Sequence, residues 1–290
     1  MADIIDPNES TKPSISRRGF IGVSALAGVA AGSGLAATAT AAAQFGTVHE
    51  PLVPENDPAI TIVNVELPRP DVTIDGYAAI PRDATRLSPG VVVVQAIWGV
   101  DTQLRDVVRR FAKAGFAVIA PNLYFRFHAP SGDGATDIAP FKAIAQQLND
   151  DQVDGDLVAG AAWLRQRAGV DPLHRPPKVG ITGFCMGGGI ALRVAATAPA
   201  FDACAIWYGR VTDQEASELT IPMLGSYGGR DTSIPVDGVR EFQSRLTVPN
   251  EIKIYPEAGH AFFDDQRKSY VASAATDAWS RTLAWFTRYL

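Results

Sequence analysis

The chain has 290 residues, 47% of them hydrophobic and 20% charged, with a net charge of −5 and a pI near 5.4. This length and apolar content suit one globular domain with a sizeable core, plus short additional segments. The mild acidity and the lack of any Lys/Arg-rich stripe exclude a typical nucleic-acid-binding protein, so no nucleic-acid partner is expected. Two cysteines, Cys185 and Cys204, are too few for a disulfide framework or a cysteine-rich zinc site.

Residues 1–43 have the organisation of an export signal. A polar stretch leads to "SRRGF" at Ser16–Phe20, and an uncharged run of small and apolar residues then reaches Ala43. The paired arginines, the mildly apolar run and the final A-x-A pattern predict a twin-arginine signal peptide that is cleaved near Ala43. We therefore expect a periplasmic or extracellular protein that engages the twin-arginine export machinery. The alternative is an N-terminal membrane anchor, against which the glycines, the hydroxyl residues and the cleavage pattern weigh.

After a proline-rich lead-in over 44–58, residues 59–290 are predicted to form a single domain of alternating strands and helices. Alternating or continuous apolar runs predict strands at 60–67, 72–80, 90–95, 116–120, 178–182, 203–208, 221–227 and 251–255. Apolar residues spaced three or four apart predict helices at 102–114, 151–167, 186–198, 236–246 and 272–289. This alternation favours an α/β fold, with a mostly parallel central sheet and helices on both faces.

Two stretches depart from the regular alternation. Asp75-Gly76 lies inside the second predicted strand and is expected either to turn a tight hairpin or to mark a bulge. Residues 122–140 follow a strand and are rich in Pro, Gly and Asp, which predicts a long irregular loop. Because α/β proteins build ligand sites at the carboxyl ends of their parallel strands, this loop is expected to border the substrate.

The stretch "GFCMG" at Gly183–Gly187 lies between a predicted strand and a predicted helix. A G-x-C-x-G sequence in that context indicates a nucleophile elbow, in which a strained turn lifts the nucleophile above the sheet. The helix N-terminus beneath Cys185 favours its thiolate form. One oxyanion donor is expected from the N–H of Met186 and the other from the N–H of Ile97, in the loop after the 90–95 strand. The alternatives are a glycine-rich phosphate cradle and a buried structural thiol.

The partners of Cys185 favour catalysis over these alternatives. Asp231 and His260 each follow a predicted strand, and they come after the elbow in the order nucleophile, acid, base that is typical of α/β-hydrolases. All three should therefore meet at the same edge of the sheet as a Cys-His-Asp triad. Cys204 lies near the start of its strand, so it is expected in the core and too far from Cys185 for a disulfide.

Most of the chain after the signal, from about residue 72 onward, resembles the dienelactone hydrolase family. The resemblance rests on "DGYAAIP", "VVVVQAIWGV", "APNLYFR", "GITGFCMGGG", "GGRDTSIP", "PEAGHAFF" and "YVASAATDAW". It implies a monomeric α/β-hydrolase without cofactor or metal, whose cysteine nucleophile opens unsaturated lactones such as carboxymethylenebutenolide (dienelactone). It also implies that Arg126 holds a substrate carboxylate, with Tyr124 and Trp98 as further substrate-binding residues.

Two positions depart from the family's pattern. Ala96 replaces a glutamate that interacts with the resting thiol, and Asp264 replaces a second carboxylate-binding arginine. The first change predicts that the thiol of Cys185 pairs directly with His260. The second argues against the dianionic substrate of the family, because an anion has replaced a cation.

The sequence therefore predicts a hydrolase that cleaves a small-molecule lactone or ester through a thioester acyl-enzyme. The alternative within enzymes is a carboxylesterase of broader specificity on small esters. A thiol-redox role for Cys185 would need a resolving cysteine close by, and a non-catalytic binding protein would have no need of an intact triad.

Overall fold

The computed structural model describes residues 48–83, 88–167 and 176–290, and these all fall within one compact unit, Thr40–Leu290. The predicted signal peptide, its cleavage position at Ala43 and the first residues of the lead-in lie outside the described residues. Within the described residues, no helix combines the length and the apolar character needed to cross a bilayer.

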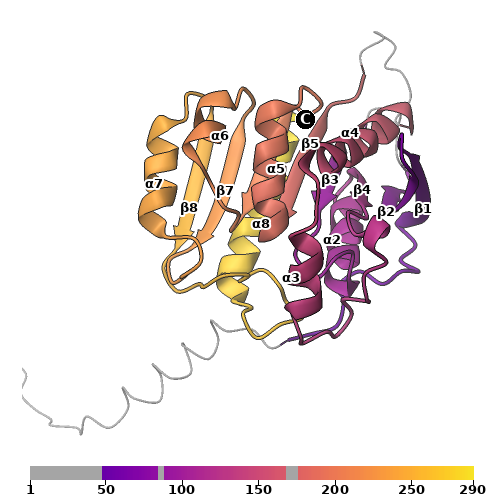
Figure 1. Ribbon diagram of the computed structural model, residues 1–290, viewed down its shortest axis with the longest axis horizontal. Coiled ribbons are helices and arrows are strands. Elements are labelled where there is room, and N and C mark those ends of the chain that lie inside the picture. Colours follow the sequence, from indigo (N-terminus) through magenta and orange to yellow (C-terminus); the bar gives the residue numbers. More distant parts are fainter. Residues whose placement is uncertain (1–47, 84–87, 168–175) are drawn as a thin grey trace, which may run out of the picture. The chain divides into compact units, whose positions relative to one another are not determined.

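The described strands form one sheet of eight, in the order β1-β2-β4-β3-β5-β6-β7-β8. The pairs β1–β2 and β2–β4 are antiparallel, and the other pairs are parallel. Figure 1 shows this order, with β1 and β8 at opposite ends of the sheet. The strands are β1 (Ile60–Pro68), β2 (Thr73–Pro81), β3 (Gly90–Val94), β4 (Ala117–Pro121), β5 (Val179–Phe184), β6 (Ala203–Trp207), β7 (Met223–Gly228) and β8 (Asn250–Tyr255).

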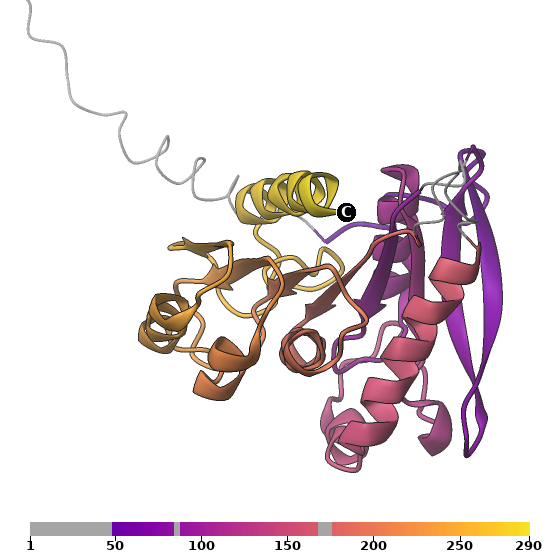
Figure 2. The same ribbon diagram turned by 90° about the horizontal axis from the view of Figure 1, so that it is seen from above.

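Helices cover both faces of the sheet, as Figure 2 shows with α8 on one side and α5, α6 and α7 on the other. Strand residues alternate between two cores: Val91 and Val93 pack toward α2 and α8, and Val92 and Val94 pack toward α4 and α5. The helices are α2 (Thr102–Lys113), α3 (Ala139–Ala145), α4 (Asp150–Arg167), α5 (Met186–Thr197), α6 (Asp213–Glu218), α7 (Val236–Arg245) and α8 (Ala272–Tyr289), with a 3-10 turn, η1 (Phe125–Phe127). This architecture confirms the predicted α/β-hydrolase fold.

The two expectations for Asp75-Gly76 were both wrong. These residues lie inside β2, where Asp75 pairs with Glu66 and Gly76 with Val65 in an uninterrupted antiparallel register. The chain reverses earlier, at a turn in which the N–H of Arg69 donates to the carbonyl of Val72. The long-range register of the sheet therefore overrides the local turn preference of an Asp-Gly pair.

The lead-in is irregular, as predicted, but its described part lies against the domain. The N–H groups of Leu52 and Val53 donate to the carboxylate of Asp106 on α2, at 2.9 and 2.8 Å, and Val53 is buried. Two short helices were not predicted. Helix α3 begins at Ala139, within the stretch expected to be irregular, and α6 follows β6 with a capping box between Thr212 and Glu215.

Candidate active site

Cys185 occupies a strained turn between β5 and α5. Its backbone has φ 56° and ψ −118°, a left-handed conformation that a residue with a Cβ rarely adopts. The turn needs glycine on both sides: a Cβ on Gly183 would lie 2.1 Å from the carbonyl oxygen of Gly187, and one on Gly187 would lie 2.2 Å from that of Gln95. The turn therefore has the geometry of the elbow that the sequence indicated, with the thiol at the N-terminus of α5.

A hydrogen-bonded chain joins the three residues of the predicted triad. His260 Nε2 lies 2.9 Å from Cys185 Sγ, and His260 Nδ1 lies 2.7 Å from Asp231 Oδ2. The other oxygen of Asp231 accepts hydrogen bonds from the N–H groups of Ser233 and Ile234, at 2.8 and 3.0 Å. Residues that are 75 and 29 positions apart in the chain thus form one line from carboxylate to thiol.

The surroundings of the triad favour the protonated, positively charged form of His260. Burial alone would lower the pKa of His260, but the hydrogen bonds to Asp231 and Cys185 raise it overall to about 10. For Asp231, burial acts in the opposite direction and would raise the pKa. The hydrogen bonds from His260 and from two backbone N–H groups outweigh burial and lower the pKa of Asp231 below its usual value. An imidazolium between two acceptors is therefore the state that the geometry stabilises.

The two predicted oxyanion donors are the N–H groups of Met186 and Ile97, and the side chain of Tyr124 contacts both residues. Met186 is the first residue of α5, so its N–H has no acceptor in a preceding turn of the helix. The hydroxyl of Tyr124 donates to the carbonyl oxygen of Ile97 at 3.0 Å and lies 3.7 Å from the sulfur of Met186. Burial raises the pKa of Tyr124, so its phenol keeps the proton that it donates. Tyr124 thus ties the loop after β3 to the elbow.

The expected role of Arg126 must be corrected. Its guanidinium donates to both oxygens of Asp71, at 2.7 and 3.0 Å, and to both oxygens of Asp156, at 2.7 and 3.1 Å. Asp156 lies on α4 with its side chain only 1% exposed. Arg126 therefore makes four hydrogen bonds to carboxylates of its own chain, and it is not among the residues that line the neighbouring cavity.

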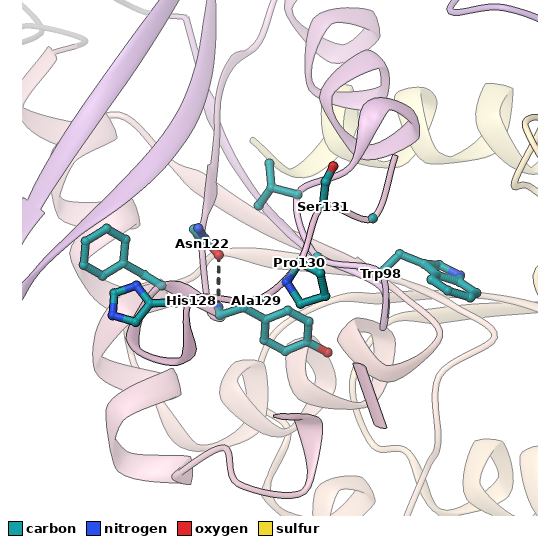
Figure 3. Close-up of a pocket in the computed structure, with 11 residues that line it drawn as sticks. Trp98, Asn122, His128, Ala129, Pro130 and Ser131 are labelled. Carbon is teal, nitrogen blue, oxygen red and sulfur yellow. Dashed lines mark hydrogen bonds between the residues drawn. The ribbon is translucent and has the colours of Figure 1, made fainter. Parts of the chain in front are cut away.

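Trp98 and Tyr124 line a cavity of about 280 Å³ beside the predicted oxyanion loop. Figure 3 shows Trp98 and His128 on opposite sides of it, with Asn122 and Pro130 between them. The face of the Trp98 ring is covered by the guanidinium of Arg267, whose central carbon lies 3.8 Å from the ring centroid. Both aromatic residues that the resemblance pointed to thus lie at this cavity, where Tyr124 is almost fully buried.

The two positions that depart from the family's pattern, Ala96 and Asp264, have different surroundings. Ala96 is partly buried against the core, and among the described residues no carboxylate hydrogen-bonds Cys185 Sγ. Asp264 is largely buried, which raises the pKa of its carboxyl to about 6, and it lies 3.2 Å from Arg267 Nε.

Two residues at the site were missed by the sequence reasoning. Tyr208 directly follows β6, has φ 38°, and packs edge-on against the ring of His260 with the ring centroids 5.3 Å apart. Arg267 stacks on Trp98, as described above. The sequence could have indicated Tyr208 as a site residue, because it follows the strand next to the elbow. Arg267 lies in a polar stretch with no motif, so nothing in the sequence indicated its role.

The described non-glycine residues with positive φ are His128, Cys185, Tyr208 and Ala261, all at the triad or the cavity. Strained backbone is therefore concentrated here, as it often is at functional sites.

Cys204 is separated from the thiol of Cys185 by the sheet register. It is fully buried, and both cysteines are free. It pairs with Ile181 on β5, four residues before Cys185, which corresponds to about 13 Å along a strand. That separation is too long for a disulfide, so Cys185 has no resolving partner within the chain.

The parallel sheet, the strained elbow and the acid-base chain at the carboxyl ends of the strands define an α/β-hydrolase. Residues 74–290 match the dienelactone hydrolase family over most of the chain, and this chain belongs to that family. It is a hydrolase of the dienelactone hydrolase type.

Two comparisons illustrate how close its relatives are. The Escherichia coli K12 protein named "Putative carboxymethylenebutenolidase" is 38% identical over 252 residues, which cover 82% of this chain and 91% of that protein. The crystal structure of a "Putative Dienelactone Hydrolase" from Klebsiella pneumoniae is 37% identical, with a TM-score of 0.71, and covers 80% of this chain and all of that one. A cold-adapted esterase from an Arctic metagenomic library, at 15% identity and a TM-score of 0.61, shares the fold.

Proposed function

We propose that this protein hydrolyses small lactones or esters through a Cys185-His260-Asp231 triad and a thioester acyl-enzyme. The observation that carries the proposal is the continuous chain from Asp231 Oδ2 through both ring nitrogens of His260 to Cys185 Sγ. A thiol held at 2.9 Å from an imidazole that is itself oriented by a carboxylate is an activated nucleophile. The names of the relatives support a carboxymethylenebutenolidase-type reaction on an unsaturated lactone.

Acylation begins with the thiol proton on His260 and the thiolate on Cys185. The thiolate attacks the carbonyl carbon of the lactone or ester, and the carbonyl electrons move onto its oxygen. The N–H groups of Met186 and Ile97 stabilise that oxyanion. When the intermediate collapses, the C–O bond breaks and the imidazolium of His260 gives its proton to the leaving alkoxide. In a lactone the alkoxide stays attached, so the opened ring remains on the enzyme as a thioester.

Deacylation uses the same groups in reverse roles. Neutral His260 takes a proton from water, and the resulting hydroxide attacks the thioester carbonyl. The thiolate of Cys185 then leaves, and the carboxylic acid product dissociates. Asp231 keeps the imidazole oriented and stabilises its charged form throughout, because it bonds the nitrogen that does not face the thiol.

A carboxylesterase of broader specificity on small esters is the second candidate. Two charged residues favour it, because neither matches the charges expected at a lactone site. Asp264 stands where a cation was expected, and Arg126 is held by two carboxylates. A panel of lactones and esters separates the two candidates, because a carboxylesterase cleaves every ester faster than any lactone.

The thioester itself is the decisive test of the mechanism. When the protein is mixed with 4-nitrophenyl acetate and quenched in acid within milliseconds, the peptide that contains Cys185 is expected to gain the mass of one acetyl group. Hydroxylamine should remove it, because thioesters react readily with that nucleophile. The Cys185→Ser variant, which can form only an oxygen ester, should give no adduct that neutral hydroxylamine removes. An acetyl group found on any other residue at the steady-state level would overturn the proposed nucleophile.

We also propose that the protein acts outside the cytoplasm after twin-arginine export. The support is "SRRGF" followed by the uncharged run that ends at Ala43. Expressed with its full sequence in a bacterium, the protein is expected in the periplasmic fraction in a form that begins near Gln44. Replacing both Arg17 and Arg18 with lysine should leave it in the cytoplasm at its full length. Export of the double lysine variant at the wild-type level would contradict this proposal.

A further inference from the structure

Two arginines that neighbour the lining of the cavity, Arg126 after Phe125 and Arg267 on the ring of Trp98, are each paired with carboxylates of the chain. Arg126 and Arg69 share the carboxylate of Asp156, and Arg126 also bonds Asp71, so two cations meet two anions. The hydrogen bonds from Arg126 hold the pKa of Asp71 at about 2, which keeps both members of the pair ionised at any physiological pH. A substrate carboxylate could reach Arg126 only by displacing one of these partners. Displacing Asp156 would leave that buried carboxylate with Arg69 as its one remaining ion-pair partner among the described residues, which is unfavourable.

The second cation near the site is also paired. Arg267 lies 3.2 Å from Asp264 and 3.9 Å from Asp101, and its Nη1 donates to the carbonyl oxygen of Ala135 at 2.8 Å. One guanidinium thus faces two carboxylates, while its flat face is covered by Trp98. Burial raises the pKa of Asp101 and of Asp264 to about 6, so both are predominantly ionised above that pH. This side of Trp98 carries no surplus of positive charge at neutral pH.

The cavity that Trp98 lines has no acidic or basic side chain other than a histidine among its described lining residues. Of the described residues that line it, none is a lysine, arginine, aspartate or glutamate, and His128 is the one histidine. The remaining lining is neutral and includes the aromatic residues Trp98, Tyr124 and Phe125 and the amide of Asn122. Figure 3 shows Trp98 and Asn122 at the cavity. The cavity borders the predicted oxyanion loop, because Trp98 follows Ile97 directly and Tyr124 bonds the Ile97 carbonyl. Its volume of about 280 Å³ suits a small acyl or alcohol group.

We infer that this site selects lactones and esters whose acyl and leaving groups carry no charge, and that it discriminates against substrates with a free carboxylate. The inference rests on the proposed function and specifies its substrate class. A carboxylate that entered the cavity would lose part of its hydration shell and find no lysine or arginine in the lining to compensate, because Arg126 and Arg267 lie outside the lining and are already paired. A neutral group of the same length would lose nothing comparable and would gain contact with the aromatic lining.

A matched pair of esters tests the inference on the wild-type protein. 4-Nitrophenyl hexanoate and mono-4-nitrophenyl adipate have acyl chains of the same carbon number, and only the adipate ends in a carboxylate. After each rate is normalised to that of hydroxide-catalysed hydrolysis, kcat/KM for the hexanoate is expected to exceed that for the adipate by about tenfold or more. An equal or greater kcat/KM for the adipate would overturn the inference.

Two variants identify the groups responsible. His128→Lys places a cation at the cavity and is expected to raise kcat/KM for the adipate about tenfold relative to the hexanoate. His128→Gln removes the imidazole without adding charge, so it isolates the effect of the cation. Arg126→Gln is expected to leave the ratio of the two esters within about twofold, although the loss of its ion pairs with Asp71 and Asp156 will lower the melting temperature.

The outcomes separate this inference from the proposed function. A tenfold further loss of adipate hydrolysis in Arg126→Gln would mean that Arg126 binds the carboxylate, and would overturn the inference alone. If Arg126→Gln does not fold, the wild-type ratio and the His128→Lys gain still decide. If the wild-type protein hydrolyses neither ester and forms no thioester, the proposed function itself fails.

Discussion

Replacement of Cys185 by alanine is expected to lower kcat for ester or lactone hydrolysis by about 10⁴-fold, with little change in thermal stability. The reason is that the variant retains the oxyanion donors and the cavity but loses the atom that forms the covalent intermediate. The side chain of Cys185 is only partly buried, and it makes one hydrogen bond among the described residues, to His260. Steady-state kinetics with 4-nitrophenyl esters and a melting curve of each protein measure both effects.

The chain supplies a matched control in its other cysteine. Cys204→Ala removes a thiol that is fully buried in β6 and is expected to keep activity within about twofold, while lowering the melting temperature by a few degrees. If Cys185→Ala retained the wild-type rate, or if Cys204→Ala lost activity while still folded, the assignment of the nucleophile would be wrong.

His260→Gln is expected to change how the reactivity of Cys185 depends on pH. In the wild-type protein the hydrogen bonds to Asp231 and Cys185 raise the pKa of His260 to about 10, so a protonated imidazole faces the sulfur from neutral pH up to about 10. Alkylation by iodoacetamide requires the thiolate, so its rate should vary by less than about threefold between pH 6.5 and 8.5. In the variant no imidazolium faces the sulfur, so the thiolate loses the positive charge that stabilises it. Its rate at pH 6.5 should therefore be about tenfold or more below the wild-type rate, and it should rise with pH.

The readout is specific to one thiol. Burial raises the pKa of Cys204 and excludes the reagent from it, so the alkylation rate reports on Cys185. His49→Gln is the matched control, because it removes a histidine at Asp265, away from the triad, and should keep the wild-type profile. The same profile in His260→Gln as in the wild type would show that the helix N-terminus alone, and not the histidine, generates the thiolate.

The positions of the strands were largely predictable because their signal is local. The run of valines in β3 and the apolar residues of β5 and β6 are buried on both faces, and each segment carries that pattern within its own few residues. The elbow was predictable for the same reason, since its glycines are needed within two residues of Cys185. Helix α3 was not predicted, because only seven residues form it and the preceding stretch is rich in turn residues.

The meeting of Cys185, Asp231 and His260 was also predicted from the sequence, although the three are far apart in the chain. Each follows a strand of a parallel sheet, and right-handed crossovers bring the carboxyl ends of such strands to one edge. The rule that parallel strands end at one edge of a sheet therefore predicted that the three residues meet, which their local sequence patterns alone could not. The distances of 2.9 and 2.7 Å along the chain of hydrogen bonds could come only from the structure.

By itself, the sequence determined the alternation of strands and helices, the turn that presents Cys185, and the edge of the sheet at which its partners lie. Only the tertiary structure decided what the charged residues around that edge do. Arg126 is neutralised by Asp71 and Asp156, which lie 55 and 30 residues away on a hairpin turn and a helix. Arg267 is drawn onto Trp98 from another loop. Backbone patterns depend on neighbours a few residues apart, whereas the pairing of a charge depends on every group that folding brings within hydrogen-bond reach.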